Sequence, residues 1–159
     1  DRLRWLIEKA TELGVTRFVP ILTERSSEQA RGLRSEKTDR WVIEACKQCG
    51  RNVLMEVSDA VAWSDFLSSN TSQTARLIAT PVGVSPGALG GLSFQNGVVI
   101  AVGPEGGFTA GELDAALGLG WLPISLGPRT LRVETAALAM VASVTAFWPF
   151  PTHTHSGAE

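Results

Sequence analysis

The sequence predicts an α/β protein with a mostly parallel sheet flanked by helices. Segments with strand and helix periodicity alternate along most of the 159 residues, and such alternation is typical of parallel sheets. The segment VVIAV (98–102) is a continuous apolar run, which predicts a central strand buried on both faces. Two glycine-marked loops, 98–109 and 124–136, each leave an apolar run and end where a helix begins.

The size and composition predict one compact domain over 1–150, with a disordered tail over 151–159. The chain has 44% hydrophobic and 19% charged residues, the composition of an ordinary globular protein. No run approaches the ~18 uncharged apolar residues that a transmembrane helix needs. The N-terminal segment threads charges through its apolar positions, which is not the pattern of a signal peptide.

In the first half of the chain, apolar spacing predicts helices at 2–13 and 38–49, each ended by a glycine. RFVPIL (17–22) is predicted as one short strand, in which Pro20 favours an edge or a strand end. The polar segment 23–39 is predicted as an exposed loop, and three of its arginines are available to phosphates: Arg25, Arg31 and Arg34.

In the second half, Thr109 and Glu112 form a T-x-x-E capping box that predicts the start of a helix. The Gly- and Pro-rich segment 81–93 is predicted as a loop. The remaining predicted elements are strands at 53–57, 76–80, 98–102 and 123–126 and helices at 62–68 and 134–148.

Charge is unevenly distributed. Residues 1–51 carry a net charge of +3 and residues 52–159 one of −5. A net charge of −2 argues against a general nucleic-acid coat, but the N-terminal third is the better face for a polyanion. The alternative is that these charges only solvate helix faces.

Cys46 and Cys49 lie within a predicted helix, where a redox C-x-x-C motif would instead begin one. No second cysteine pair follows, and both histidines lie in the polar tail, so no zinc ligand set is predicted. We interpret Cys46 and Cys49 as reduced cysteines of a cytoplasmic protein with no metal.

The glycine-rich loop GPEGG (103–107) suits a ligand that is recognised through backbone hydrogen bonds. Its glycines let a ligand approach the main chain, and Glu105 is its one charge. The loop matches neither the P-loop nor the G-x-G-x-x-G pattern, which argues against a nucleoside triphosphate. Adenosine carrying a positive sulfonium fits better. The alternative is a plain tight turn after a strand.

The second loop adds Arg129 and Arg132, which are two of only three Lys and Arg residues after residue 51. Arginines beside a neutral-to-acidic pocket suit a phosphate or an electron-rich base. The alternative is that Arg132 only pairs with Glu134 or Glu105.

Five blocks resemble the ribosomal RNA small-subunit methyltransferase E family of the SPOUT superfamily. They are KATELGV (9–15), ILTERS (21–26), CKQCGRN (46–52), VGPEGGFTAGEL (102–113) and LGPRTLRVETAAL (126–138). The resemblance implies methylation of uridine N3 in 16S rRNA with S-adenosylmethionine as cofactor. It also implies a C-terminal trefoil knot, a homodimer, and an N-terminal PUA-like RNA-binding domain that this chain lacks.

Carried over by position, the resemblance implies a cofactor site from three loops. Its residues are Thr80, Pro81, Gly103, Pro104, Glu105, Gly106, Leu126, Gly127, Leu131, Arg132, Thr135 and Ala136. Thr130 and Val133 depart from the family's usual Ile and Thr, and both changes affect packing or one hydroxyl contact.

For the reaction, uridine N3 must lose a proton, so we expect Arg132 to orient the base or stabilise the developing anion. Glu105 and Glu134 are weaker candidates for the proton acceptor. Arg25, Arg51 and Arg129 are expected to bind phosphates of the small-subunit rRNA. Two alternatives are a related methyltransferase for another RNA and a binding module without catalysis.

Overall fold

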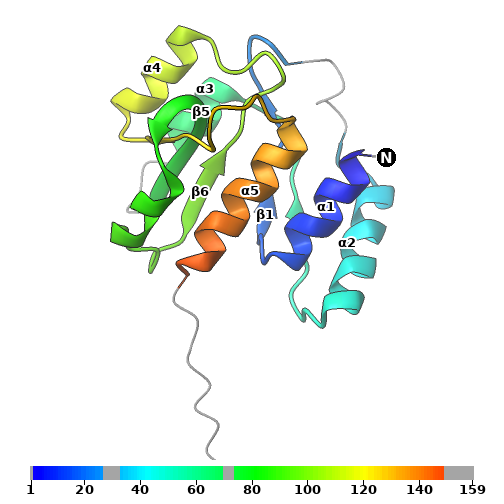
Figure 1. The fold of residues 1–159 in the computed structure, drawn as a ribbon. Coiled ribbons are helices and arrows are strands. Elements are labelled where there is room, and N and C mark those ends of the chain that lie inside the picture. Colours follow the sequence, from blue (N-terminus) through cyan, green and yellow to red (C-terminus); the bar gives the residue numbers. More distant parts are fainter. Residues whose placement is uncertain (1, 27–32, 70–73, 149–159) are drawn as a thin grey trace, which may run out of the picture.

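The computed structural model describes residues 2–26, 33–69 and 74–148. Its C-terminal half is built on three parallel strands in the order β6-β5-β7 (Figure 1). These strands are β5 (Ala75–Val84), β6 (Val98–Ala101) and β7 (Leu122–Ile124). The predicted α/β class with mostly parallel strands is therefore confirmed.

The prediction that 98–102 is the central strand is wrong. In the described sheet β5 is central, and β6 pairs only with β5. Leu77 and Ile78 of β5 are fully buried. Three of the four residues of β6 are half-buried and only Ala101 is buried, so the apolar run does not mark a strand that is fully buried on both faces. The run carries no information about how many strands lie beside it.

Side-chain alternation along β5 divides the core into two layers. Leu77 faces the cluster that contains Met140 and Val144 of α5 (Val133–Ala146), together with Leu89 of the 3₁₀ helix η2 (Pro86–Gly91). Ile78 faces the opposite cluster, which includes side chains of α3 (Trp63–Ser69) and α4 (Ala110–Gly118). The sheet is therefore covered by helices on both faces.

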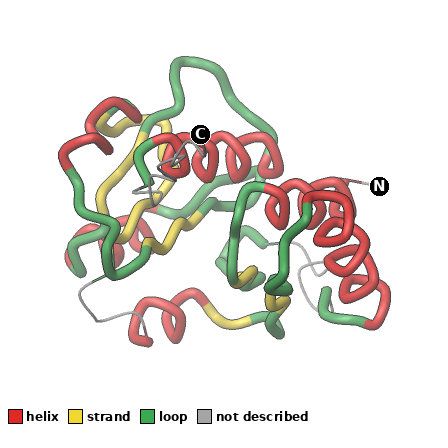
Figure 2. The backbone as a smooth tube through the Cα atoms, turned by 90° about the horizontal axis from the view of Figure 1, so that it is seen from below, coloured by secondary structure: helices red, strands yellow, loops and turns green. Residues whose placement is uncertain are grey.

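The N-terminal part packs α1 (Arg2–Glu12) along α2 (Glu36–Cys49), and Figure 2 shows this pair at the opposite end from the three-stranded sheet. Ile7 and Ala10 of α1 meet Trp41, Val42 and Cys46 of α2 in a buried cluster. Leu138 of α5 packs against this cluster, which joins the two parts of the chain.

The predicted single strand at 17–22 is in fact two short strands. β1 (Arg17–Phe18) pairs in parallel with β3 (Glu56–Val57), and β2 (Ile21–Leu22) pairs in parallel with β4 (Val61–Ala62). Pro20 lies between them; it has no N–H to donate, and its carbonyl accepts from Val61 N. The strand pattern was correct, but the proline interrupts the pairing.

Several predicted boundaries also change. β3 begins at Glu56, not at 53, and β5 continues to Val84 through residues predicted as loop. The segment 81–93 also contains η2. α2 begins at Glu36 because Ser35 and Thr38 form a reciprocal capping box. Arg31 and the tail over 151–159 lie outside the described residues. In the described part of the chain, no helix is long and apolar enough to cross a membrane.

The fully buried position of Ile78 predicts a large loss of stability on truncation. Ile78→Ala should lower the free energy of unfolding by about 2–5 kcal/mol, because the helices on that face cannot close the cavity. Val53→Ala, at a residue that is 65% exposed, is the control and should change it by less than about 0.5 kcal/mol. Urea unfolding followed by circular dichroism measures both, and equal effects would contradict the assigned core.

Candidate ligand site at the strand ends

The register of the sheet brings the three predicted loops to one edge. Ile78 lies opposite both Ala101 and Pro123, and Ala79 lies opposite Ile124. Because the strands are parallel, their regular pairing ends at about one level: at Ala101 in β6, at Ile124 in β7 and at Ala79 in β5, beyond which the register of β5 is irregular. Thr80 and Pro81, the segment 103–106 and the segment 126–136 therefore start side by side, although they lie far apart in the sequence.

The segment 80–84 lies tightly against the end of β7. Both Ala79 and Val84 are in register with Ile124, so the residues between them form an irregular bulge. Ser125 donates its N–H to Val84 O at 2.9 Å and its hydroxyl to Pro81 O at 3.1 Å. A Cβ on Gly83 would lie 2.5 Å from Pro123 O, so only glycine permits this approach.

The loop from Leu126 to Leu131 has backbone N–H groups that are unpaired among the residues that the structure describes. Gly127 has φ +110°, which strongly favours glycine. Arg132 is the N-cap of α5, and its side chain makes no capping hydrogen bond. Within the described residues, no backbone N–H of this loop donates to a protein acceptor. The loop can therefore present several N–H groups to a ligand.

The GPEGG loop packs on the ring of Phe108 and is hydrogen-bonded to Arg25. A Cβ on Gly103 would lie 3.1 Å from Phe108, whose ring lies 4.8 Å from that of Trp63. Gly107 donates its N–H to Pro104 O at 2.7 Å, and Gly106 O accepts from Arg25 Nη1 at 2.6 Å. Glu105 is exposed.

The charged candidates at the start of α5 have different partners from those expected. The carboxylate of Glu134 is mostly buried and pairs with Arg2 of α1 at 3.6 Å. The guanidinium of Arg132 is exposed and makes no ion pair with any described residue. The alternative in which Arg132 is neutralised by Glu134 or Glu105 is therefore not what the structure shows. Thr135 is exposed and Ala136 is half-buried.

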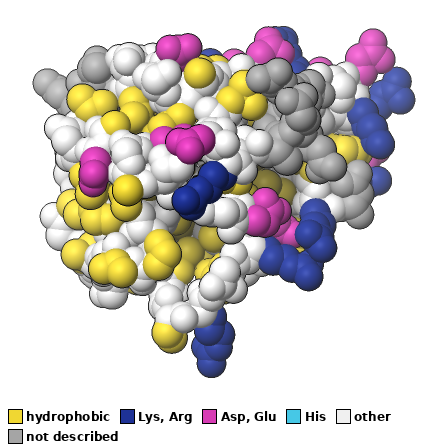
Figure 3. Space-filling model, turned by 90° about the horizontal axis from the view of Figure 1, so that it is seen from above, with side chains coloured by type: hydrophobic (Ala, Val, Ile, Leu, Met, Phe, Trp, Pro, Cys, Tyr) yellow, Lys and Arg dark blue, Asp and Glu magenta, His cyan; other side chains and the backbone are white. Residues whose placement is uncertain are grey.

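The three arginines predicted to bind RNA phosphates lie in different environments. Arg129 is exposed on the second loop, whereas Arg25 contacts Gly106. Arg51 Nη1 donates to Thr11 O at 2.9 Å and Val15 O at 2.7 Å, so it satisfies carbonyls at the end of α1. Seen from the strand-end side, several Lys and Arg side chains gather toward α1 and α2, and hydrophobic ones toward the opposite side (Figure 3).

Two contacts at the site were not predicted from the sequence. The Arg2–Glu134 pair joins the start of α1 to the start of α5, and no local pattern signals it. The sequence predicts Glu112 as a capping residue, but it does not predict that the same carboxylate also accepts from Glu24 N at 2.8 Å. The capping box could have indicated this contact, because it uses one oxygen of the Glu112 carboxylate and leaves the other free to accept a hydrogen bond.

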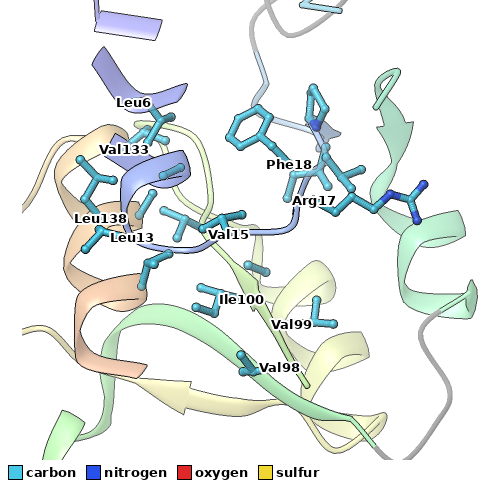
Figure 4. Close-up of a pocket in the computed structure, with 18 of the residues that line it drawn as sticks. Leu6, Leu13, Val15, Arg17, Phe18, Val98, Val99, Ile100, Val133 and Leu138 are labelled. Atoms are coloured by element: carbon cyan, nitrogen blue, oxygen red, sulfur yellow. The ribbon is translucent and has the colours of Figure 1, made fainter. Parts of the chain in front are cut away.

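A separate cavity of about 720 Å³ lies between α1, β1, β6 and α5. Its lining is mainly hydrocarbon, and Figure 4 shows the guanidinium of Arg17 directed away from it, where Arg17 Nε donates to Ser58 at 2.9 Å. Of the predicted cofactor residues, only Gly103, Pro104 and Glu105 reach this cavity. The others are grouped at the strand ends, outside it.

No group of three or more His, Cys, Asp and Glu side chains among the described residues is arranged to hold a metal. Cys46 is buried, Cys49 is exposed, and their thiols donate to Val53 O and Cys46 O respectively. Both cysteines thus have local partners at the end of α2.

Comparison with known proteins identifies the family. The RNA methyltransferase domain family matches residues 1–145. Ribosomal RNA small subunit methyltransferase E of Aquifex aeolicus is 37% identical over 139 residues, which are 86% of this chain and 59% of that protein. Its counterpart in Synechocystis is 32% identical over 145 residues, 89% of this chain and 48% of that protein.

A solved structure shows the same fold. It is that of a ribosomal RNA small subunit methyltransferase E from Neisseria gonorrhoeae bound to S-adenosyl methionine, with a TM-score of 0.81 at 33% identity. The match covers 93% of this chain and 62% of that one. The chain thus spans about half to three fifths of the length of these proteins. By sequence and by fold, it belongs to the RNA methyltransferase domain family.

Proposed function

We propose that this chain is the catalytic domain of an enzyme that methylates N3 of a uridine in 16S rRNA, with S-adenosylmethionine as the methyl donor. The observation that carries the proposal is the convergence of three loops at one level of a parallel sheet. One of them presents backbone N–H groups that have no acceptor among the described residues. The named relatives, which are small-subunit rRNA methyltransferases, supply the substrate class.

The residues present fit the cofactor. Its adenosine part can be bound by the N–H groups of the loop from Leu126 to Leu131, in which every residue except Pro128 has one. Its positive sulfonium is compatible with a loop whose one charge is Glu105. When bound, it supplies an electrophilic methyl group. The residues that would hold it are Thr80, Pro81, Gly103, Pro104, Glu105, Gly106, Leu126, Gly127, Leu131, Arg132, Thr135 and Ala136.

Arg132 is the residue best placed to act on the uridine. Its guanidinium is exposed at the N-terminus of α5 and is not neutralised by a described carboxylate. It can donate to O2 or O4 of the base, which stabilises the anion formed when N3 loses its proton. The positive end of the helix dipole acts in the same direction.

Two carboxylates are candidates to receive the N3 proton. Glu105 is exposed on the GPEGG loop, and Glu134 is held near the start of α5 by Arg2. The carboxylate of Glu134 is mostly buried and already paired with Arg2, whereas Glu105 is exposed and has no ion-pair partner among the described residues. We therefore favour Glu105 as the acceptor and a positioning function for Glu134.

The rRNA is proposed to cross the strand-end face toward α1 and α2. Arg129 is exposed there and Arg25 retains further N–H groups beyond its bond to Gly106. Arg51 is the weakest of the three candidates, because its Nη1 is already bonded to two carbonyls. The proposed partner is the small ribosomal subunit, which places the protein in the cytoplasm.

A knot and a homodimer also belong to the proposal. The contacts of Ser125 with Pro81 and Val84 support a C-terminal segment threaded beneath 80–84. Val82 is 85% exposed and Phe147 is 44% exposed, and both would be covered in a dimer. Light scattering coupled to size-exclusion chromatography measures the oligomeric state.

The main test is Arg132→Ala, assayed by transfer of labelled methyl to 30S subunits and mass mapping of the methylated uridine. Loss of one charged donor to the anion should lower kcat by about 10²–10³-fold. Arg129→Ala is the control and should mainly raise the KM for RNA. Equal rates for wild type and Arg132→Ala would contradict the proposed catalytic function, and methyl in another RNA would support the related-methyltransferase alternative.

The second test uses the backbone of the second loop. Gly127→Ala should cost about 1–3 kcal/mol, because φ +110° is strained for alanine, and should weaken S-adenosylmethionine binding. Gly111→Ala, which adds the same methyl to α4 where no atom lies within 4 Å, should stabilise the helix by up to about 1 kcal/mol. Calorimetric titration and urea unfolding measure both. Unchanged affinity in Gly127→Ala would remove this loop from the cofactor site.

A further inference from the structure

The turn 23–26 is held in shape by its own hydrogen bonds. Thr23 N donates to Ser26 Oγ at 2.9 Å, and Ser26 N donates to Thr23 O at 3.1 Å. The two hydroxyl oxygens lie 3.0 Å apart, and Ser26 Oγ also donates to Ile21 O at 3.3 Å. The turn is therefore a defined local structure at the end of β2.

Glu112 connects this turn to the start of α4. Its Oε2 accepts from Thr109 N at 2.9 Å and from Thr109 Oγ1 at 3.2 Å, as in a capping box. Its Oε1 accepts from Glu24 N at 2.8 Å. One carboxylate thus joins segments that are 88 residues apart in the sequence.

Arg25 makes the second connection, to the GPEGG loop. Its Nη1 donates to Gly106 O at 2.6 Å. Its aliphatic stem lies on Gly106, since a Cβ there would be 3.2 Å from Arg25 Cδ. Within the described residues, the loop's own backbone bond is the one from Gly107 N to Pro104 O.

The two connections hold the segment 103–109 from outside, at Gly106 and at Thr109. Three of its seven residues are glycines, whose freedom makes an unrestrained loop costly to order around a ligand. A loop held in its bound form before the ligand arrives avoids that cost. The restraint comes from a turn that contributes none of the proposed cofactor residues.

We propose that Arg25 and Glu112 are positioning residues that hold the GPEGG loop in the form that binds the cofactor. This inference rests on the proposed function for the identity of that ligand. It gives Arg25 a function that does not require RNA. If Arg25 only bound phosphates of the RNA, its removal would change the affinity for RNA alone. If Arg25 positions the GPEGG loop, its removal changes the affinity for the cofactor even when no RNA is present.

Glu112→Gln separates the connection from the helix cap. The capping box accepts Gln as well as Glu, so α4 keeps its cap. The amide retains one acceptor oxygen, and its NH₂ group cannot accept from Glu24 N. Glu24→Gln is the matched control, because it makes the same change in charge on the turn and leaves the Glu24 N–H in place.

For Glu112→Gln and Arg25→Ala, we expect about tenfold weaker binding of S-adenosylmethionine by calorimetry without RNA, the effect of one charged hydrogen bond. In the ligand-free protein, amide hydrogen exchange over 105–108 should be faster in both variants. Glu24→Gln should match the wild type in both measurements. Arg25→Ala is at an exposed residue, so it tests the inference even if Glu112→Gln is unstable.

Wild-type affinity together with wild-type exchange in both variants would overturn the inference, as would an equal effect of Glu24→Gln. A wild-type chain that binds no S-adenosylmethionine would contradict the proposed function instead. Hydrogen exchange in the ligand-free protein would still decide whether Arg25 and Glu112 restrain the loop. The two failures are therefore distinguishable.

Discussion

The parallel register of β6, β5 and β7 is the constraint on which the rest of the molecule depends. Ile78 lies opposite Ala101 and Pro123, and this alignment brings three distant loops to one level. The alignment is enforced by burial, because Leu77 and Ile78 fill opposite layers and a slip of one residue would exchange them. Core packing therefore determines where the loops meet.

Close backbone contacts then shape the loops. Gly83 lets the segment 80–84 approach β7, and Gly127 takes a conformation strained for other residues. These positions use backbone freedom to present N–H groups, which suits a ligand recognised through hydrogen bonds better than one held by many charges. Arg132, the N-cap of α5, supplies an exposed positive charge beside these loops.

The arginines show how tertiary contacts divide similar side chains among different functions. Arg51 is bonded to carbonyls at the end of α1, Arg2 holds Glu134, and Arg25 contacts Gly106. The first contact joins the ends of α2 and α1, the second joins α1 to the start of α5, and the third joins the turn after β2 to the GPEGG loop. From the sequence alone, any of these arginines could be expected to bind phosphate.

The sequence by itself determined the α/β class, the helices that end at glycine, the capping box at Thr109 and the position of the GPEGG loop and the second loop after strands of the sheet. These features depend on local periodicity and on residues whose backbone preferences are strong. It did not determine that β5 is the central strand, that Pro20 divides one strand into two, or which partners the charged side chains take. Strand order and ion pairs depend on contacts between segments far apart in the chain, and no local pattern records those contacts. The tertiary structure alone decided that Arg132 is left unpaired among the described residues while Glu112 and Arg25 hold the neighbouring loop.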